Sequence, residues 1–194
     1  MPKIFKESER NRIIEDLRSG AAECLGIYGV KKTTVDELVR RANIAKGTFY
    51  LFYDSKEALF ADVLITFEER VEGMYLEMLQ NLDENHIVTS LTDVFTAIAM
   101  KTYEDGIFRF FENSNIDLVQ RKLPEKNFRE VTTNARSVFR NLFSYFSIDN
   151  EDDIEAFTDG YNAIIRLFTE AEHIPQLEKT IRFLIRGLVL QMVE

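Results

Sequence analysis

The chain has 194 residues, a formal net charge of −9 and 45% hydrophobic residues. With three prolines and eight glycines, its composition excludes a disordered or fibrous chain and predicts one large globular domain, or a small domain fused to a medium one. Residues 1–60 carry 11 Lys and Arg against 9 Asp and Glu, whereas residues 61–194 carry 13 against 24. Only the first third could approach a polyanion without strong repulsion.

The chain lacks the sequence features of secretion and membrane insertion. Its start, MPKIFKESERNR, has no apolar core that would suit a signal peptide, and no apolar run approaches the roughly 18 residues of a membrane span. The single cysteine, Cys24, lies at helical spacing from Leu17, Ala21 and Tyr28, and we interpret it as a small buried residue. We expect a soluble cytoplasmic protein without membrane partners.

Apolar positions recur every three or four residues along almost the whole chain, and no stretch alternates with a period of two. The predicted fold class is therefore all-α, with about nine helices. The first helix is expected over about 8–28, where Gly29 supplies a stop. Thr34 and Glu37 have the spacing of a capping box and begin a second, short helix that ends near Ala42. Asn43 tolerates the left-handed backbone of a tight turn, and a third short helix follows over about 46–52.

The fourth helix is expected to begin at a cap formed by Asp54 or Ser55 and to reach about Gln80. It joins an N-terminal head, residues 1–53, to a larger acidic body, residues 54–194. Five more helices are expected in the body, over about 86–103, 105–120 with a break near Asn113 to Asn115, 124–146, 150–172 and 174–193. Pro124 and Pro175 stand where helix starts tolerate proline.

Residues 34–53 read as helix, tight turn, helix, the arrangement in which a second short helix enters the DNA major groove. Apolar residues such as Leu38 and Phe49 fall where the helices face each other, which leaves a set of small, polar and basic residues facing outward. Glycine permits close backbone approach, threonine suits a base edge, and lysine and tyrosine reach phosphates. A lysine at the start of the fourth helix would strengthen an anion site there. The candidate DNA-binding residues are Thr33, Thr34, Lys46, Gly47, Thr48, Tyr50, Tyr53 and Lys56.

The stretch TTVDELVRRANIAKGTFYLFYDSKEALF resembles the DNA-binding region of TetR-family transcriptional regulators, and the likeness extends over about residues 10–65. Three positions depart from the family pattern. Asn43 replaces the usual turn glycine, and Val39 replaces a small alanine. Ala45 replaces the usual serine before the recognition helix, which removes a polar group that could contact a phosphate.

The resemblance implies an all-helical homodimer whose last two helices pair across a two-fold axis into a four-helix bundle. The sequence of those helices agrees, because the segment over 150–172 has a second face of small residues and the final helix is apolar nearly all round, as a helix covered by a partner subunit would be. The candidate dimer-interface residues are Ala156, Gly160, Ala163, Leu167, Phe183, Gly187 and Leu190.

The resemblance also implies a pocket for a small-molecule effector among the middle helices. The body is rich in aromatic residues, which suit a planar or lipophilic molecule, although they would equally suit an ordinary aromatic core. The candidate ligand-binding residues are Tyr103, Phe108, Phe111, Thr132, Phe139, Tyr161 and Asn162. The expected function is a regulator, typically a repressor, that leaves a palindromic double-stranded DNA operator when the effector binds.

Two other classes of protein are alternatives to a DNA-binding regulator. An enzyme is disfavoured, because the sequence has no Cys/His spacing for zinc, no Ser-centred elbow and no glycine-rich phosphate loop. We expect no metal and no cofactor. A helical adaptor or regulator that acts through protein partners, or as an activator, stays open as the alternative.

Overall fold

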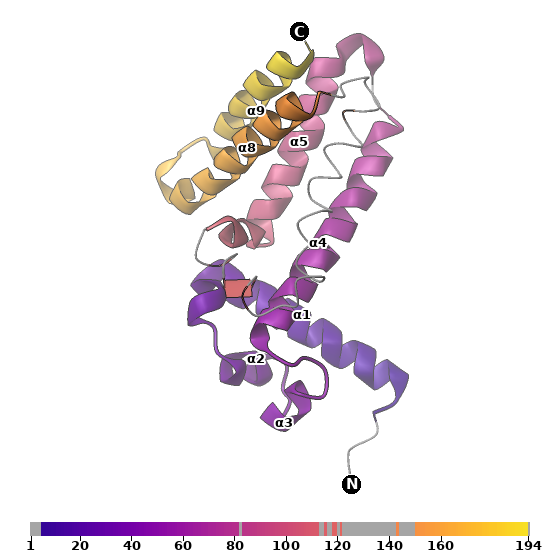
Figure 1. Cartoon of the computed structure of the whole chain (residues 1–194), viewed down its shortest axis with the longest axis vertical. Coiled ribbons are helices and arrows are strands. Elements are labelled where there is room, and N and C mark those ends of the chain that lie inside the picture. Colours follow the sequence, from indigo (N-terminus) through magenta and orange to yellow (C-terminus); the bar gives the residue numbers. More distant parts are fainter. Residues whose placement is uncertain are drawn as a thin grey trace.

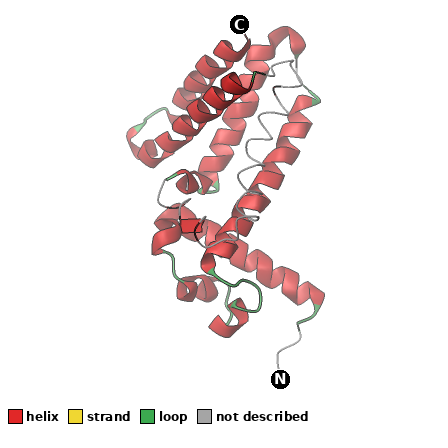
Figure 2. Ribbon diagram, viewed as in Figure 1, coloured by secondary structure: helices red, strands yellow, loops and turns green. Residues whose placement is uncertain are grey.

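The computed structural model describes residues 5–81, 83–112, 115, 118, 119, 121, 143 and 150–193. Within these residues every regular element is a helix (Figure 2). The predicted all-α class is therefore confirmed. Of the helices expected in the body, the one over 124–146 lies outside the described residues.

The head comprises three helices that pack at one end of the molecule (Figure 1). They are α1 (Glu7–Lys32), α2 (Val35–Arg41) and α3 (Lys46–Phe49). The first helix is interrupted and not stopped by Gly29, which has φ 70°, and it continues for one further turn. The core of the head is built from fully buried residues of all three helices and of the start of the next: Leu17, Leu25, Leu38, Phe49 and Phe60.

The long helix α4 (Lys56–Leu79) leaves the head and runs along the body (Figure 1). Its N-cap is Ser55, whose hydroxyl accepts a 3.1 Å hydrogen bond from the Ala58 N–H, so the expected cap is confirmed. Beyond it lie the 3-10 helix η1 (Glu84–His86) and α5 (Ile87–Glu104), and then η2 (Ile107–Phe111), a second 3-10 helix where a regular helix over 105–120 was expected. Gly106, with φ 69°, starts η2 in a left-handed conformation.

The chain ends in α8 (Glu151–Arg166), the 3-10 helix η3 (Leu167–His173) and α9 (Leu177–Val193). These two α-helices lie side by side and pack with α5 at the end of the molecule opposite the head (Figure 1). Ile181, Ile185 and Val189 form the inward stripe of α9. Among the described residues, no helix is long and apolar enough to cross a membrane.

Candidate nucleic-acid interface and adjoining cleft

The turn between α2 and α3 has the geometry that the sequence predicts. The hydroxyl of Thr34, the N-cap of α2, accepts a 3.2 Å hydrogen bond from the Glu37 N–H. Asn43 has φ 51°, the left-handed conformation that its short polar side chain tolerates. The Ile44 N–H then donates back to the Val39 carbonyl at 3.0 Å, which closes the turn. Short-range chemistry thus sets the angle at which α3 leaves α2.

The outer face of α3 is open to solvent and mixes small, polar and basic side chains. A Cβ at Gly47 would meet no atom within 4 Å, so the backbone there can approach a partner closely. Tyr50 is 51% exposed, and Thr48 is partly exposed. The Lys46 ammonium lies 2.9 Å from the Asp36 carboxylate, and both side chains are more than half exposed. An exposed ion pair is weak, so Lys46 can exchange this partner for a phosphate.

Ala45 occupies the N-cap position of α3 and makes no side-chain capping bond. The Thr48 N–H, one of the groups that a serine at this position could cap, instead donates to the Ala45 carbonyl at 2.8 Å.

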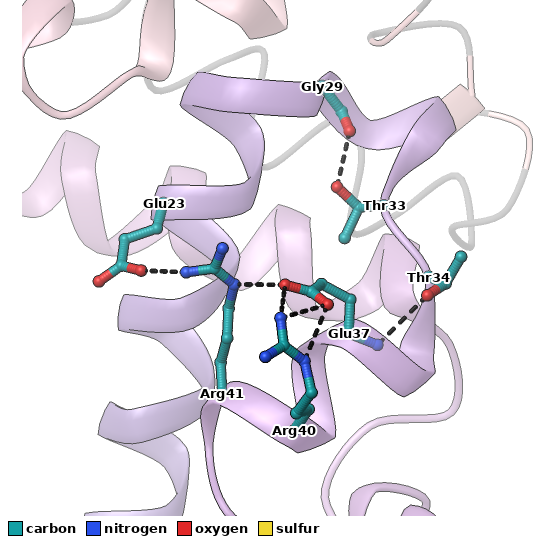
Figure 3. Close-up of polar contacts among 7 residues, drawn as sticks. All are labelled: Glu23, Gly29, Thr33, Thr34, Glu37, Arg40 and Arg41. Carbon is teal, nitrogen blue, oxygen red and sulfur yellow. Dashed lines mark hydrogen bonds and ion pairs between the residues drawn. The ribbon is translucent and has the colours of Figure 1, made fainter.

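One of the two predicted threonine contacts, Thr33, is placed differently by the structure, whereas Thr34 is exposed. Thr33 is 1% exposed, and its hydroxyl donates a 2.8 Å hydrogen bond to the Gly29 carbonyl (Figure 3). Its side chain therefore closes the last turn of α1 and does not face outward. Thr34 lies next to it and caps α2, where its hydroxyl serves as an acceptor (Figure 3).

The ammonium group of Lys56 also faces the protein interior. It donates to the Thr33 carbonyl at 2.6 Å, to the Val30 carbonyl at 2.8 Å and to the Lys31 carbonyl at 3.3 Å. An ammonium group has three N–H donors, and these three carbonyl oxygens match them. The geometry gives Lys56 the role of joining the C-terminal end of α1 to the start of α4.

Tyr53 takes part in a three-residue polar network behind the recognition helix. Its hydroxyl donates to the Asp62 carboxylate, which also receives two 2.7 Å hydrogen bonds from the Arg18 guanidinium. Burial raises the pKa of the Tyr53 hydroxyl, and the bond to Asp62 adds to this effect. Burial would raise the pKa of Asp62 as well, but the hydrogen bonds from Arg18 and Tyr53 outweigh it and hold that pKa below its usual range.

A second network, which the sequence interpretation missed, fixes α2 on α1. The Glu37 carboxylate accepts from Arg40 at 2.7 Å and from Arg41 at 2.9 Å, and Arg41 reaches on to Glu23 of α1 (Figure 3). Gly20 makes room for this crossing, because a Cβ there would lie 3.1 Å from the Arg41 Cβ. The i, i+3 and i, i+4 spacing of the three α2 residues was the available signal.

A cleft of about 1030 Å³ lies where the head meets the body. Its walls come from α1, α4, the end of α5, η2 and η3. Two predicted ligand residues line it: the rings of Tyr103 and Phe108 lie 5.6 Å apart. Phe168, which the sequence interpretation did not assign to the ligand, completes this wall with its ring 4.9 Å from that of Tyr103.

The arginines of the cleft are paired with carboxylates, and further carboxylates, among them Glu15 and Glu172, also line it. Arg18 is held by Asp62, Arg70 lies 3.4 Å from Asp105, and Arg109 lies 3.0 Å from Glu112. Each arginine that lines the cleft thus has a carboxylate partner already. The walls favour a molecule that is bound by rings and apolar surface over a multiply charged anion.

The remaining predicted ligand residues lie elsewhere. Tyr161 is 4% exposed, belongs to a buried aromatic cluster with Phe95, and donates its hydroxyl to the Phe95 carbonyl at 2.9 Å. Asn162 and Phe111 are partly buried outside the walls of the cleft. Thr132 and Phe139 lie outside the described residues.

The predicted dimer face is exposed on α8 and α9. Phe183 is 78% exposed, unusually high for a large aromatic residue, and Leu167 is 36% exposed. Ala156, Ala163 and Gly187 are exposed too, while Leu190 is partly buried. Gly160 permits the close packing of the two helices, because a Cβ there would come within 2.9 Å of the Leu188 side chain.

Comparison with known proteins agrees with this geometry. The sequence model of the bacterial regulatory proteins of the tetR family matches residues 17–63, from the middle of α1 into α4. Two relatives from Bacillus subtilis (strain 168) are described as uncharacterized HTH-type transcriptional regulators. YdgC is 29% identical over 96 residues, 50% of this chain and 46% of its own length. YhgD is 39% identical over 57 residues, 29% of this chain and 26% of its own length. The matches thus span less than half of the relatives.

Solved structures resemble nearly the whole chain. The fatty acid degradation regulator FadR of Bacillus halodurans has a TM-score of 0.67 at 13% identity, with 96% of this chain and 97% of that one covered. A TetR-family transcriptional regulator of Bordetella parapertussis 12822 has a TM-score of 0.65 at 18% identity, with 94% and 95% covered. At these identities the likeness shows a shared fold of head and body.

Proposed function

Because the chain belongs to the tetR family of bacterial regulatory proteins, a family of transcription regulators and not of enzymes, we propose that it binds double-stranded operator DNA as a homodimer. The observation that carries this proposal is the exposed face of α3, the second helix of the helix-turn-helix. This face carries Lys46, Gly47, Thr48 and Tyr50. A homodimer would present two such faces to a palindromic site, and the exposed Phe183 on α9 supports an interface between two copies.

We further propose that a small lipophilic molecule controls this binding from the head–body cleft. Tyr103, Phe108 and Phe168 supply the ring surface, and the cleft touches both α1 of the head and α4. A molecule there would favour one orientation of the head over another. Ligand and operator would then weaken each other's binding by the same factor, and repression would end when the ligand arrives.

The experiment is a salt titration of DNA binding, with a duplex that the wild-type protein selects from a random-sequence library. We expect the logarithm of affinity to fall linearly with the logarithm of salt concentration. Lys46→Ala should flatten this slope by about one unit for each subunit that loses a phosphate contact. The comparison variant is Lys56→Met, which should lower the affinity without changing the slope, because its ammonium is bound to three backbone carbonyls and not to a phosphate.

Failure to select any duplex at low salt would contradict the operator proposal and favour an adaptor that acts through protein partners. The effector is tested separately, by native mass spectrometry of the purified protein followed by DNA binding with and without the compound found. A compound that occupies the protein and leaves DNA affinity unchanged would contradict the effector proposal.

A further inference from the structure

The first helix is broken at Gly29, near its C-terminal end and just before the helix-turn-helix begins. Gly29, with φ 70° and ψ 173°, turns the chain out of helical geometry. In a continuous α-helix the Val30 N–H would donate to the carbonyl of Gly26, four residues earlier. Val30 is 0% exposed, so an unpaired N–H there could not turn to water.

Both halves of this helical hydrogen bond are taken up by side chains of the body. The Val30 N–H donates to the Asn115 amide oxygen at 3.2 Å. The Gly26 carbonyl accepts from the Arg109 guanidinium at 3.1 Å. The two body residues therefore occupy the donor and acceptor positions that the break in α1 leaves open.

The partners of Asn115 fix the direction of its amide group. Its nitrogen donates to the Arg109 carbonyl at 2.7 Å and to the Glu112 carboxylate at 3.3 Å, groups that can only accept. Its oxygen must then be the atom that faces Val30, whose N–H can only donate. Asn115 is 2% exposed, so these bonds are made away from water.

Backbone packing brings the two segments close enough for these bonds. A Cβ at Gly106 would lie 2.7 Å from the Gly26 Cα, so a side chain at Gly106 would separate α1 from η2. Gly106 also needs its left-handed φ of 69° to begin η2. The approach of η2 to α1 therefore depends on Gly106, whereas a Cβ at Gly26 would make an ordinary contact of 3.5 Å with the Gly106 Cα.

Lys56 of α4 holds the same turn from a second side. While Asn115 receives the N–H of Val30, the Lys56 ammonium donates to the carbonyls of Val30 and Thr33. The next residue, Thr34, caps α2. The short segment 30–33, which sets where the helix-turn-helix begins, is thus fixed by the body through its N–H and by α4 through its carbonyls.

We propose that Asn115 and Arg109 are positioning residues for DNA binding, which set the orientation of the head by completing the broken hydrogen bond of α1. In the described part of the chain, this joint attaches the head to the body in addition to the continuous helix α4 and the side chains that α4 sends to α1. A single helix leaves rotation about its axis open, whereas a second, polar attachment removes that freedom. The proposal is tested by DNA affinity and by hydrogen exchange. Only the affinity measurement rests on the proposed DNA binding.

The experiment compares Asn115→Ala with wild type at a temperature well below unfolding of either protein. We expect affinity for the selected duplex to fall at least about tenfold, since a buried N–H loses its acceptor. Hydrogen exchange of the peptide over residues 27–33 should accelerate. The matched control is Thr102→Val, which removes a buried hydroxyl bonded only to its own helix, at 2.8 Å from the Ile98 carbonyl. It should change neither measurement.

Arg109→Met provides a second variant should Asn115→Ala fail to fold, because its side chain is one-third exposed and its loss leaves Asn115 in place. We expect a severalfold loss of affinity and faster exchange over 27–33. Unchanged DNA affinity in a folded variant of either residue would overturn the proposal, even if that variant were less stable. A wild-type protein that binds no DNA would overturn the proposed function instead, and the exchange measurement would still test the joint.

Discussion

The head and the body satisfy their polar groups in different ways. In the head and at its contact with the start of α4, side chains far apart in the sequence pair with one another, as Arg18 does with Asp62 of α4 across 44 residues and Arg41 with Glu23 across 18. In the body, the buried threonines of α5 donate to carbonyls of their own helix, and long-range polar pairs are found beside them, as between Tyr161 and Phe95 and between Arg182 and Asp93. The body is held together by contacts between rings, with the Phe95 ring 5.1 Å from that of Phe157.

This difference explains why the two regions differ in how recognisable their sequences are. A bidentate ion pair requires one residue type at each end, whereas a ring in an apolar core can be exchanged for another apolar group of similar volume. The family model accordingly matches residues 17–63, while the fold of FadR is shared over 96% of this chain at 13% identity. The fold of the head depends on particular residue types, whereas the fold of the body depends on the spacing of apolar positions.

The largest expected effect is the loss of a ring from the body. Phe95 is 1% exposed and contacts the rings of Phe143, Phe157 and Tyr161. Phe95→Ala should lower the free energy of unfolding by about 3–5 kcal/mol, because it removes buried apolar surface and leaves a cavity. Phe95→Leu should cost less than about 1.5 kcal/mol, since it keeps most of the volume. Urea unfolding monitored by circular dichroism measures both, and equal losses in the two variants would contradict exchangeable packing.

In the polar network of the head, a substitution that preserves side-chain shape should still lower the free energy of unfolding. Asp62→Asn keeps the volume but removes the charge that Arg18 binds through two 2.7 Å hydrogen bonds. We expect a loss of about 2 kcal/mol at pH 7, comparable to one charge-assisted hydrogen bond. A loss below that of Phe95→Leu would break the proposed contrast between head and body.

The pH dependence of this loss has a definite sign. The pKa of Asp62 lies below its usual range in the folded protein, so the native state binds fewer protons than the unfolded state. The stabilisation is fully present above the unfolded pKa of about 3.9 and is lost as pH falls through the folded pKa. The difference between wild type and Asp62→Asn should therefore be constant from about pH 6 to 8 and shrink below about pH 4.

The sequence predicts those parts of the fold that depend on neighbouring residues. The turn at Asn43 and the caps at Thr34 and Ser55 are confirmed, because each is closed by a bond within five residues. The expected helix over 105–120 was wrong for the part described at its start, where Gly106 adopts a left-handed conformation and η2 follows. A glycine can adopt that conformation or a helical one, and packing against Gly26 decides between them.

The candidate site shows the same limit. The open face of α3 could be predicted because it follows from helical spacing within one turn. The internal roles of Lys56 and Tyr53 could not, since their partners Val30 and Asp62 are brought to them by packing of separate helices. Asn115 lies 85 residues from Val30, and nothing in its own surroundings in the sequence points to that partner.

The smallest expected effect concerns a carboxylate on the helix that joins the two regions. Glu68 of α4 has a buried oxygen, Oε2, that lacks a hydrogen-bond partner in the described part of the chain. Burial raises the pKa of Glu68 above its usual range. The folded protein therefore holds a proton that the unfolded chain releases near pH 4.3, and wild-type stability should decline as pH rises from about 4.3.

Glu68→Gln removes this titration while it keeps the side-chain shape. At pH 5 the variant and the wild type should unfold at nearly the same urea concentration, whereas at pH 8 the variant should be more stable by about 1 kcal/mol, a value typical of one unpaired buried polar group. Glu69→Gln, at an exposed position of the same helix, is the control and should give a difference that does not change with pH. If wild type gained stability from pH 5 to pH 8 relative to Glu68→Gln, the carboxylate would have a partner in the folded protein. The polar satisfaction found in the head would then extend along α4 into the body.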